Sequence, residues 1–116
     1  MRRAVSLISL VVLLVACTAN AQLKEERGGV AEWPTTCDGA VAKLSTELSQ
    51  SEKEDLAATA RDDLILLHHG FGTGIRNEFG LWGGNLALIE SCSGSPNSHP
   101  DDVSIIIVER LWGSLQ

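Results

Sequence analysis

Long hydrophobic runs and basic residues are both scarce in this 116-residue chain. The longest apolar run, residues 4–16, is shorter than the roughly 20 residues needed to cross a bilayer, and no later segment reaches that length. This argues against a membrane-spanning domain. Nine Lys and Arg residues face 15 Asp and Glu residues, for a net charge of −6 at pH 7. Because proteins bind nucleic acid chiefly through basic residues, this balance predicts no nucleic-acid partner.

Aromatic residues are few as well. Tyrosine is absent and phenylalanine occurs only twice, so the chain has little bulky apolar material. The three tryptophans, Trp33, Trp82 and Trp112, are therefore expected to supply much of the core volume. We expect at least two of them to be buried rather than exposed as anchors of an interface.

The one apolar run stands at the start of the chain. Residues 1–3 include two arginines, residues 4–16 are almost entirely apolar, and residues 17–21 are mostly small. This order is typical of a secretory signal peptide. It predicts an exported protein, located in the periplasm or anchored as a lipoprotein in the bacterial envelope.

Two cleavage sites compete within this signal. Cleavage before Cys17 would follow a lipobox-like sequence and leave a lipidated cysteine, whereas cleavage after Ala21 would release a soluble chain. The lipobox lies directly at the end of the apolar run and a polar segment follows it, which favours lipidation of Cys17. A lipid anchor at this residue is the one membrane contact that we expect.

Removal of the signal changes both the charge and the cysteine count. It takes Arg2 and Arg3, leaving seven basic residues against all 15 acidic ones, a net charge of −8. Two cysteines remain, Cys37 and Cys92, in a compartment where disulfides persist. We predict that they pair, which would stabilise the fold by about 4 kcal/mol; two buried free thiols are the alternative.

The mature chain reads as a flexible leader over residues 22–32 followed by one helical domain over residues 33–116. Capping residues and apolar spacing predict an all-α fold, a compact array of four or five helices. The expected helices run from Thr35 to Ser49, from Ser51 to Ala60, from Asp62 to Trp82, from Asn85 to Cys92, and from Ser98 to Trp112.

Two of these helices leave alternatives open. Gly70, Gly72 and Gly74 could break the third helix, but we favour a continuous or gently kinked one, in which the glycines allow another backbone to approach. The β-branched run in residues 103–108 could form a strand. The proline and acidic residues before it, at 100–102, favour a helix buried on several sides.

Three separated motifs carry a resemblance to a known family. They are Trp33-Pro34-Thr35-Thr36, the segment Ile75-Arg76-Asn77-Glu78-Phe79-Gly80-Leu81-Trp82, and His99-Pro100-Asp101-Asp102 with the following Ser104, Ile107 and Leu111-Trp112. With these motifs the chain resembles a family of small bacterial domains described only as a domain of unknown function. The resemblance covers residues 33 to 112 and implies no activity, substrate or cofactor.

The most interesting polar side chains are Arg76, Asn77 and Glu78, which interrupt an apolar segment, together with His68. The Arg76 guanidinium could bind a carboxylate or phosphate of a ligand. The favoured interpretation is instead an internal salt bridge from Arg76 to an acid such as Asp102 or Glu109, bracing the last helix.

No metal or cofactor site is expected. His68 and His69 are adjacent and point to different faces of a helix, so they cannot join one site, and His99 is most simply a capping residue. Asp101 and Asp102 are explained by the positive end of the last helix rather than as paired catalytic carboxylates.

The chain carries no recognisable nucleophile, phosphate-loop or catalytic-triad motif, so no catalytic residue is assigned. The favoured hypothesis is a non-enzymatic protein-interaction module of the bacterial envelope, whose partner is an unidentified protein. A periplasmic immunity or inhibitor protein against a toxin is one version of it. The alternatives are an enzyme of unrecognised type centred on His68, Arg76 and Glu78, and a purely structural envelope lipoprotein.

Overall fold

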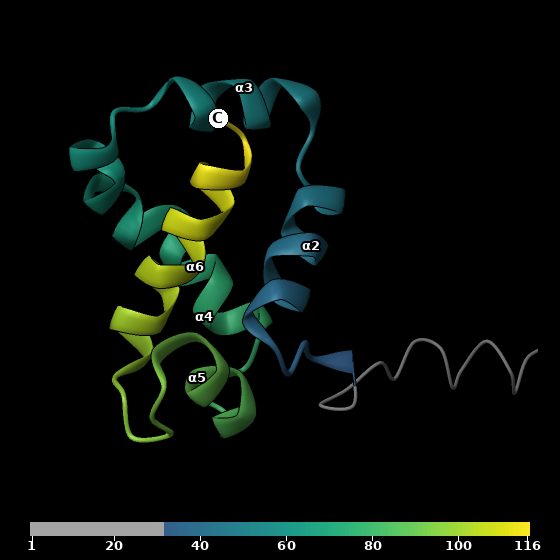
Figure 1. Ribbon diagram of the computed structural model, residues 1–116, viewed down its shortest axis with the longest axis vertical. Coiled ribbons are helices and arrows are strands. Elements are labelled where there is room, and N and C mark those ends of the chain that lie inside the picture. Colours follow the sequence, from purple (N-terminus) through teal and green to yellow (C-terminus); the bar gives the residue numbers. More distant parts are fainter. Residues whose placement is uncertain (1–31) are drawn as a thin grey trace, which may run out of the picture. The chain divides into compact units, whose positions relative to one another are not determined.

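The computed structural model describes residues 32–116, of which residues 33–116 form an all-helical domain. The described residues contain five α-helices, with a 3₁₀ segment and a π segment between the second and third of them (Figure 1). In chain order the elements are α2 (Cys37–Glu47), α3 (Gln50–Ala58), η2 (Arg61–Leu67), η3 (His68–Gly72), α4 (Thr73–Glu78), α5 (Leu86–Ser93) and α6 (Pro100–Ser114).

The all-α prediction is confirmed for this domain, including the number of helices. The expected signal peptide, both cleavage sites, Cys17 and the leader up to residue 31 lie outside the described residues. Within residues 32–116, none of the helices combines the length and the apolar character needed to cross a bilayer.

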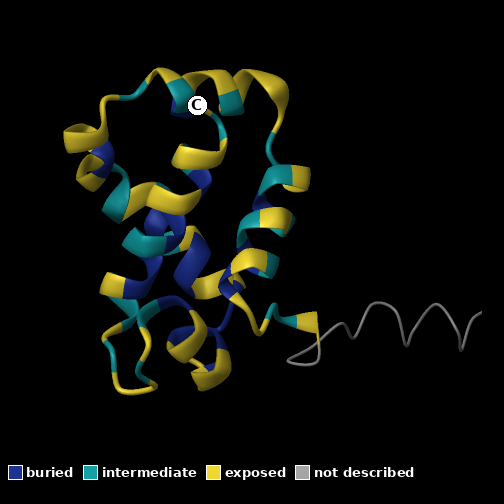
Figure 2. Ribbon diagram, viewed as in Figure 1, coloured by how far each residue is buried: buried dark blue, intermediate teal, exposed yellow. Residues whose placement is uncertain are grey.

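Helix α6 is the centre of the domain and packs against α2, α3, η2, η3, α4 and α5 (Figures 1 and 2). Its start is fixed by His99, whose Nδ1 accepts the Asp101 backbone N–H at 3.1 Å, and by Pro100 in the first turn. Five of its side chains are buried: Val103, Ser104, Ile107, Val108 and Leu111. The strand alternative is therefore wrong, and the helix is buried on several sides as expected.

Helices α2 and α3 begin at neighbours of the predicted caps. Thr36, rather than Thr35, caps α2 by accepting the Gly39 N–H. The capping box of α3 uses Ser49 and Glu52, two residues before the expected pair. The sequence contains two such pairs, Ser49 with Glu52 and Ser51 with Glu54. Because α2 already ends at Glu47, Ser49 lies outside that helix, and the first pair forms the capping box.

The expected helix over residues 62–82 forms as a helical segment over residues 61–78 that changes type twice. It continues through the three glycines, as the favoured prediction of an unbroken helix expected. Its type changes along the chain, however, from 3₁₀ to π and then to α-helix. It ends four residues early because Gly80 adopts a φ of 66°, and a Cβ there would overlap the Trp33 ring.

This early end corrects the prediction for the tryptophans. The turn after Phe79 places Trp82 at the surface, where the residue is 61% exposed and its ring contacts His99 edge-on. Trp33 and Trp112 are only partly buried. The expectation that at least two tryptophans would be buried is wrong, because aliphatic side chains and Phe79 fill the core instead.

The predicted disulfide between Cys37 and Cys92 is confirmed, and it joins the start of α2 to the end of α5. Both residues are buried. The backbone N–H of Cys37 donates to the Ser91 hydroxyl at 2.8 Å, which satisfies one of the free amide groups at the start of α2. Asn85 caps α5 through the Leu88 N–H, as predicted.

Candidate functional site

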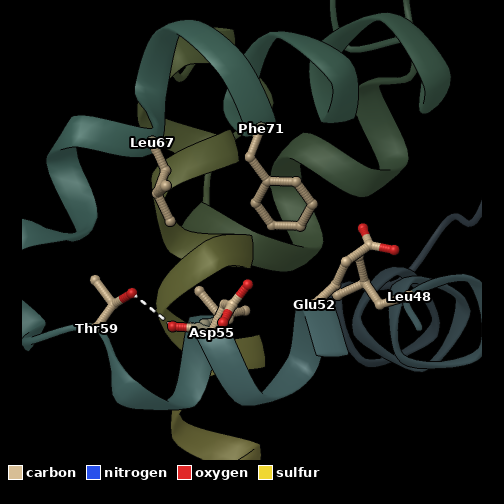
Figure 3. A pocket seen from close by; sticks show the side chains of 7 residues that line it. Leu48, Glu52, Asp55, Thr59, Leu67 and Phe71 are labelled. Atoms are coloured by element: carbon tan, nitrogen blue, oxygen red, sulfur yellow. Dashed lines mark hydrogen bonds between the residues drawn. The ribbon is translucent and has the colours of Figure 1, made fainter. Parts of the chain in front are cut away.

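A groove separates α2 and α3 from the helical segment of η2, η3 and α4. It consists of two adjoining cavities of about 210 and 300 Å³, and Leu48 and Phe71 line both of them. In Figure 3, Leu67 and Phe71 lie on one side of the first cavity and point toward α3 on the other. We call this feature the α2–α4 groove.

The surface of the groove is mainly apolar. Leu48 and Phe71 are only partly buried although they pack against the core, so the groove leaves them accessible to solvent. The apolar side chains that line it are Leu44, Leu48, Leu56, Leu67, Phe71 and Ile75. Concave, apolar and partly open surfaces of this kind are where proteins bind ligands or segments of other proteins.

Four carboxylates stand on the rim of the groove. Glu47 comes from α2, Glu52 and Asp55 come from α3, and Glu78 comes from α4. The two cavities have no lysine or arginine among the described residues that line them. Lys43 lies close enough to act on the charge of Glu78, and its ammonium group also lies 5.9 Å from the centre of the Phe79 ring.

Glu47 and Glu78 form a carboxylate pair across the end of the groove. The pKa of Glu78 is raised above its ordinary value of 4.5, first by partial desolvation and then by a hydrogen bond with Glu47 and the repulsion of its charge. Lys43 acts in the opposite direction. Two carboxylates held together in this way favour a shared proton or a cation between them.

This pair gives the domain a pH-dependent stability with a defined sign. A pKa that is raised in the folded state adds stability at low pH, and this stability is lost as the pH rises through the folded pKa. Glu78→Gln should therefore leave the melting temperature nearly unchanged near pH 3.5 and raise it at pH 7. The gain should stay below about 1 kcal/mol because solvent screens exposed carboxylates. Thermal unfolding of both proteins at both pH values measures it, and an equal difference at the two values would contradict it.

Gly70 and Gly74 leave part of one wall of the larger cavity without side chains. Both line the larger cavity, and a Cβ added at either position would meet no atom within 4 Å. No other part of the described chain packs there, so the close approach of another backbone, which the sequence suggested, is not made within this domain. The two glycines instead face open space in the groove.

Arg76 occupies a different environment, as the hub of a buried polar network. The residue is 6% exposed, and its Nε lies 3.3 Å from the Asp101 carboxylate at the start of α6. One terminal nitrogen donates to the Ser104 hydroxyl at 2.9 Å, and the other donates to the His68 carbonyl at 3.1 Å and to the Thr73 hydroxyl at 2.9 Å. The guanidinium thus ties η3 and α4 to the first turns of α6.

Two neighbours complete this network. The guanidinium can only donate, so the His68 Nδ1, 3.3 Å from Arg76, is the acceptor in this contact, and the His68 Nε2 lies 3.7 Å from the Asp101 carboxylate. Gly72 is buried beside them, and a Cβ there would come within 3.0 Å of the guanidinium. In the described part of the chain, every buried side-chain nitrogen and oxygen has a hydrogen-bond partner. This satisfied network indicates a structural role for Arg76.

The four candidate residues that the sequence singled out therefore lie in different environments. His68 and Arg76 belong to the buried network, Asn77 is exposed, and Glu78 lines the groove. The internal salt bridge that the sequence favoured for Arg76 is present, but its partner is Asp101 rather than Asp102 or Glu109, the two acids given as examples. His68 and Glu78 line different cavities, so the residues proposed for an enzyme centre are not gathered in one pocket.

Two histidines, His68 and His99, lie close to the Asp101 carboxylate. His99 caps α6, and its Nδ1 lies 3.7 Å from the Asp101 carboxylate, which also lies 3.7 Å from His68. Within residues 32–116, no group of three His, Cys, Asp or Glu side chains is arranged to hold a metal ion.

The sequence did not identify the groove or three of its four carboxylates. Glu47, Glu52 and Asp55 belong to ordinary polar faces of short helices, and nothing in their spacing marks them. They become a rim only when α2 and α3 fold opposite residues 67–78. The one available signal was the pair of glycines at positions 70 and 74, which indicated a close approach.

Comparison with known proteins gives one match. A family model described as a domain of unknown function (DUF6794) matches residues 33–115. This range includes the three motifs on which the sequence resemblance rested, and it confirms that resemblance. The searches of curated proteins and of solved structures gave no match.

Proposed function

The chain belongs to the DUF6794 family, and we propose that its domain is a non-enzymatic protein-interaction module of the bacterial envelope that binds a partner protein in the α2–α4 groove. The observation that carries the proposal is the groove itself. It is a solvent-accessible, mainly apolar concavity whose central side chains, Leu48 and Phe71, have no covering element among the described residues. The signal-like start of the chain supports the location.

The acidic rim narrows the kind of partner. A protein with net charge −8 after export and four carboxylates around an apolar groove is complementary to a basic surface. This favours the immunity or inhibitor version of the hypothesis, in which the groove covers a basic face of an exported toxin. The rest of the domain then serves as a rigid support, held by the disulfide and by the Arg76 network.

A glycine substitution can test the groove without harming the fold. A side chain at Gly74 would project into open space, and glutamine favours a helix more than glycine does. Gly74→Gln should therefore keep or slightly raise the melting temperature while it obstructs the groove. Gly113→Gln is the matched control, because Gly113 also lies in an α-helix with open space around its Cβ and does not line the groove.

The measurement is capture from envelope extract of the native host with the mature protein as bait. We expect the wild type and Gly113→Gln to retain the same partner, and Gly74→Gln to retain less than about a tenth of it. Equal retention by Gly74→Gln would show that the partner binds elsewhere. Repeated failure of the wild type to retain any protein would contradict an interaction module.

A further inference from the structure

The walls of the groove indicate in which conformation a peptide could bind there, as an extended strand or as a helix. Helices form its walls on both sides, and the described residues offer no strand to which an extended peptide could add. Helix-in-groove binding, in which an amphipathic helix inserts its apolar face between other helices, is the mode that such walls support. Apolar side chains of the bound helix would contact Leu48, Leu67 and Phe71.

Gly70 and Gly74 fit the same mode. They are four residues apart on the wall of the larger cavity and have no side chains, so the backbone of a bound helix can come close to η3 and α4 there. Close approach of helices over small residues is a common way to gain packing contacts. In the free domain this wall has no atom within 4 Å of either Cβ position.

The rim determines the charge of the bound helix. Glu52 and Asp55 flank the smaller cavity, and the Glu47–Glu78 pair flanks the larger one, so carboxylates stand beside the apolar surface at both ends. The pKa of Glu78 is raised first by desolvation and then by its hydrogen bond with Glu47 and the repulsion between the two charges, against the opposing effect of Lys43. A cation placed between the two carboxylates would offset this repulsion. A bidentate or bridging contact from one lysine or arginine would do so.

We propose that the α2–α4 groove binds a cationic amphipathic helix, with one of its lysine or arginine side chains between Glu47 and Glu78. This inference rests on the proposed function and adds the chemistry of the occupant. The apolar face of the helix lies on Leu48 and Phe71, and its basic flanks meet the carboxylates on both sides. Nucleic acid and anionic lipid are excluded as occupants, because the same carboxylates repel them.

The probe is a fluorescently labelled 14-residue peptide of leucine and lysine, (Leu-Lys-Lys-Leu-Leu-Lys-Leu) repeated twice, which forms a basic amphipathic helix. Its binding to the mature protein is measured by anisotropy at low and at physiological salt. Two further peptides serve as controls: one with glutamate in place of lysine, and one of the same composition in which leucine and lysine alternate as far as eight leucines and six lysines allow. We expect only the first peptide to bind, with an affinity that falls as salt rises.

Charge variants then locate the contact. Glu47→Gln with Glu78→Gln should weaken binding of the lysine peptide at least about tenfold, since hydrogen bonds to charged groups contribute about 1.5–3 kcal/mol. Glu90→Gln with Glu109→Gln removes the same charge from exposed positions outside the groove, and should weaken binding less than about twofold. Equal effects of the two double variants would mean that only net charge attracts the peptide, and would overturn the proposal.

Other outcomes of the peptide-binding experiment also support or overturn the proposal. Equal binding of the glutamate peptide or of the alternating peptide would overturn the charge or the helix requirement, respectively. Displacement of the lysine peptide by a peptide of residues 22–32 would identify the chain's own leader as the occupant, and concentration-dependent dimers that the lysine peptide dissociates would identify a second copy. If the lysine peptide does not bind at any salt concentration, this inference fails, whereas capture of a partner that is lost in Gly74→Gln would still support the proposed function.

Discussion

Removal of the disulfide is expected to destabilise the domain by about 4 kcal/mol. Cys37 and Cys92 are 55 residues apart, and in the chain-entropy model closing a loop of this length restricts the unfolded chain by about that amount. Domains of this size have a total stability of about 5–15 kcal/mol. Cys37→Ala with Cys92→Ala should therefore lower the melting temperature by roughly 20 °C, measured by circular dichroism.

Two controls separate the loop effect from other causes. Wild-type protein in reductant should lose a similar amount of stability, because it keeps both side chains in place and loses only the bond. The denatured, unreduced wild type should show no reactive thiol at these two cysteines. Two reactive thiols, or a fall in melting temperature below about 5 °C for the double variant, would contradict the structural role of the bond.

The second large effect is expected from Arg76→Met. Methionine retains most of the apolar volume but leaves the His68 carbonyl and the Thr73 hydroxyl without their donor and Asp101 without its cation. Removing one member of a buried charged pair typically costs about 3–5 kcal/mol, and the partial exposure of Asp101 places this case near 3 kcal/mol. Chemical denaturation at equilibrium measures the loss directly.

Asn77 provides the matched control, since it is the next residue on α4 and is exposed. Asn77→Ala should change the free energy of unfolding by less than about 0.5 kcal/mol. If Arg76→Met keeps the wild-type free energy of unfolding but no longer binds the captured partner protein, Arg76 acts in binding, and the structural role given to its network is wrong.

Much of the fold could be predicted from local signals. Asn85 and the Pro100 start of α6 lie where the sequence placed them, because caps depend on residues within one turn of each other. The start of α3 was misplaced by two residues because Ser and Glu recur at the same spacing. Trp82 was misplaced because helical periodicity extends past Phe79 in the sequence, whereas the positive φ of Gly80 ends the helix.

The candidate site could not be predicted to the same extent. Arg76 and Glu78 were both singled out, but residues two apart on a helix point to different sides, and only the packing shows which surface each one joins. The pairing of Glu78 with Glu47 joins α4 to α2, so it depends on tertiary structure alone. The groove has no sequence signature, because its apolar side chains have the same periodicity as those of an ordinary core.

Hydrogen exchange of the mature protein, with and without its captured partner, shows whether the partner binds in the α2–α4 groove. We expect the partner to slow amide exchange in residues 44–59 and 67–78, which contain the residues that line the groove. Residues 82–93, which include the exposed Trp82, should exchange at the same rate in both samples. Protection confined to residues 82–93, with none along the groove, would contradict the account.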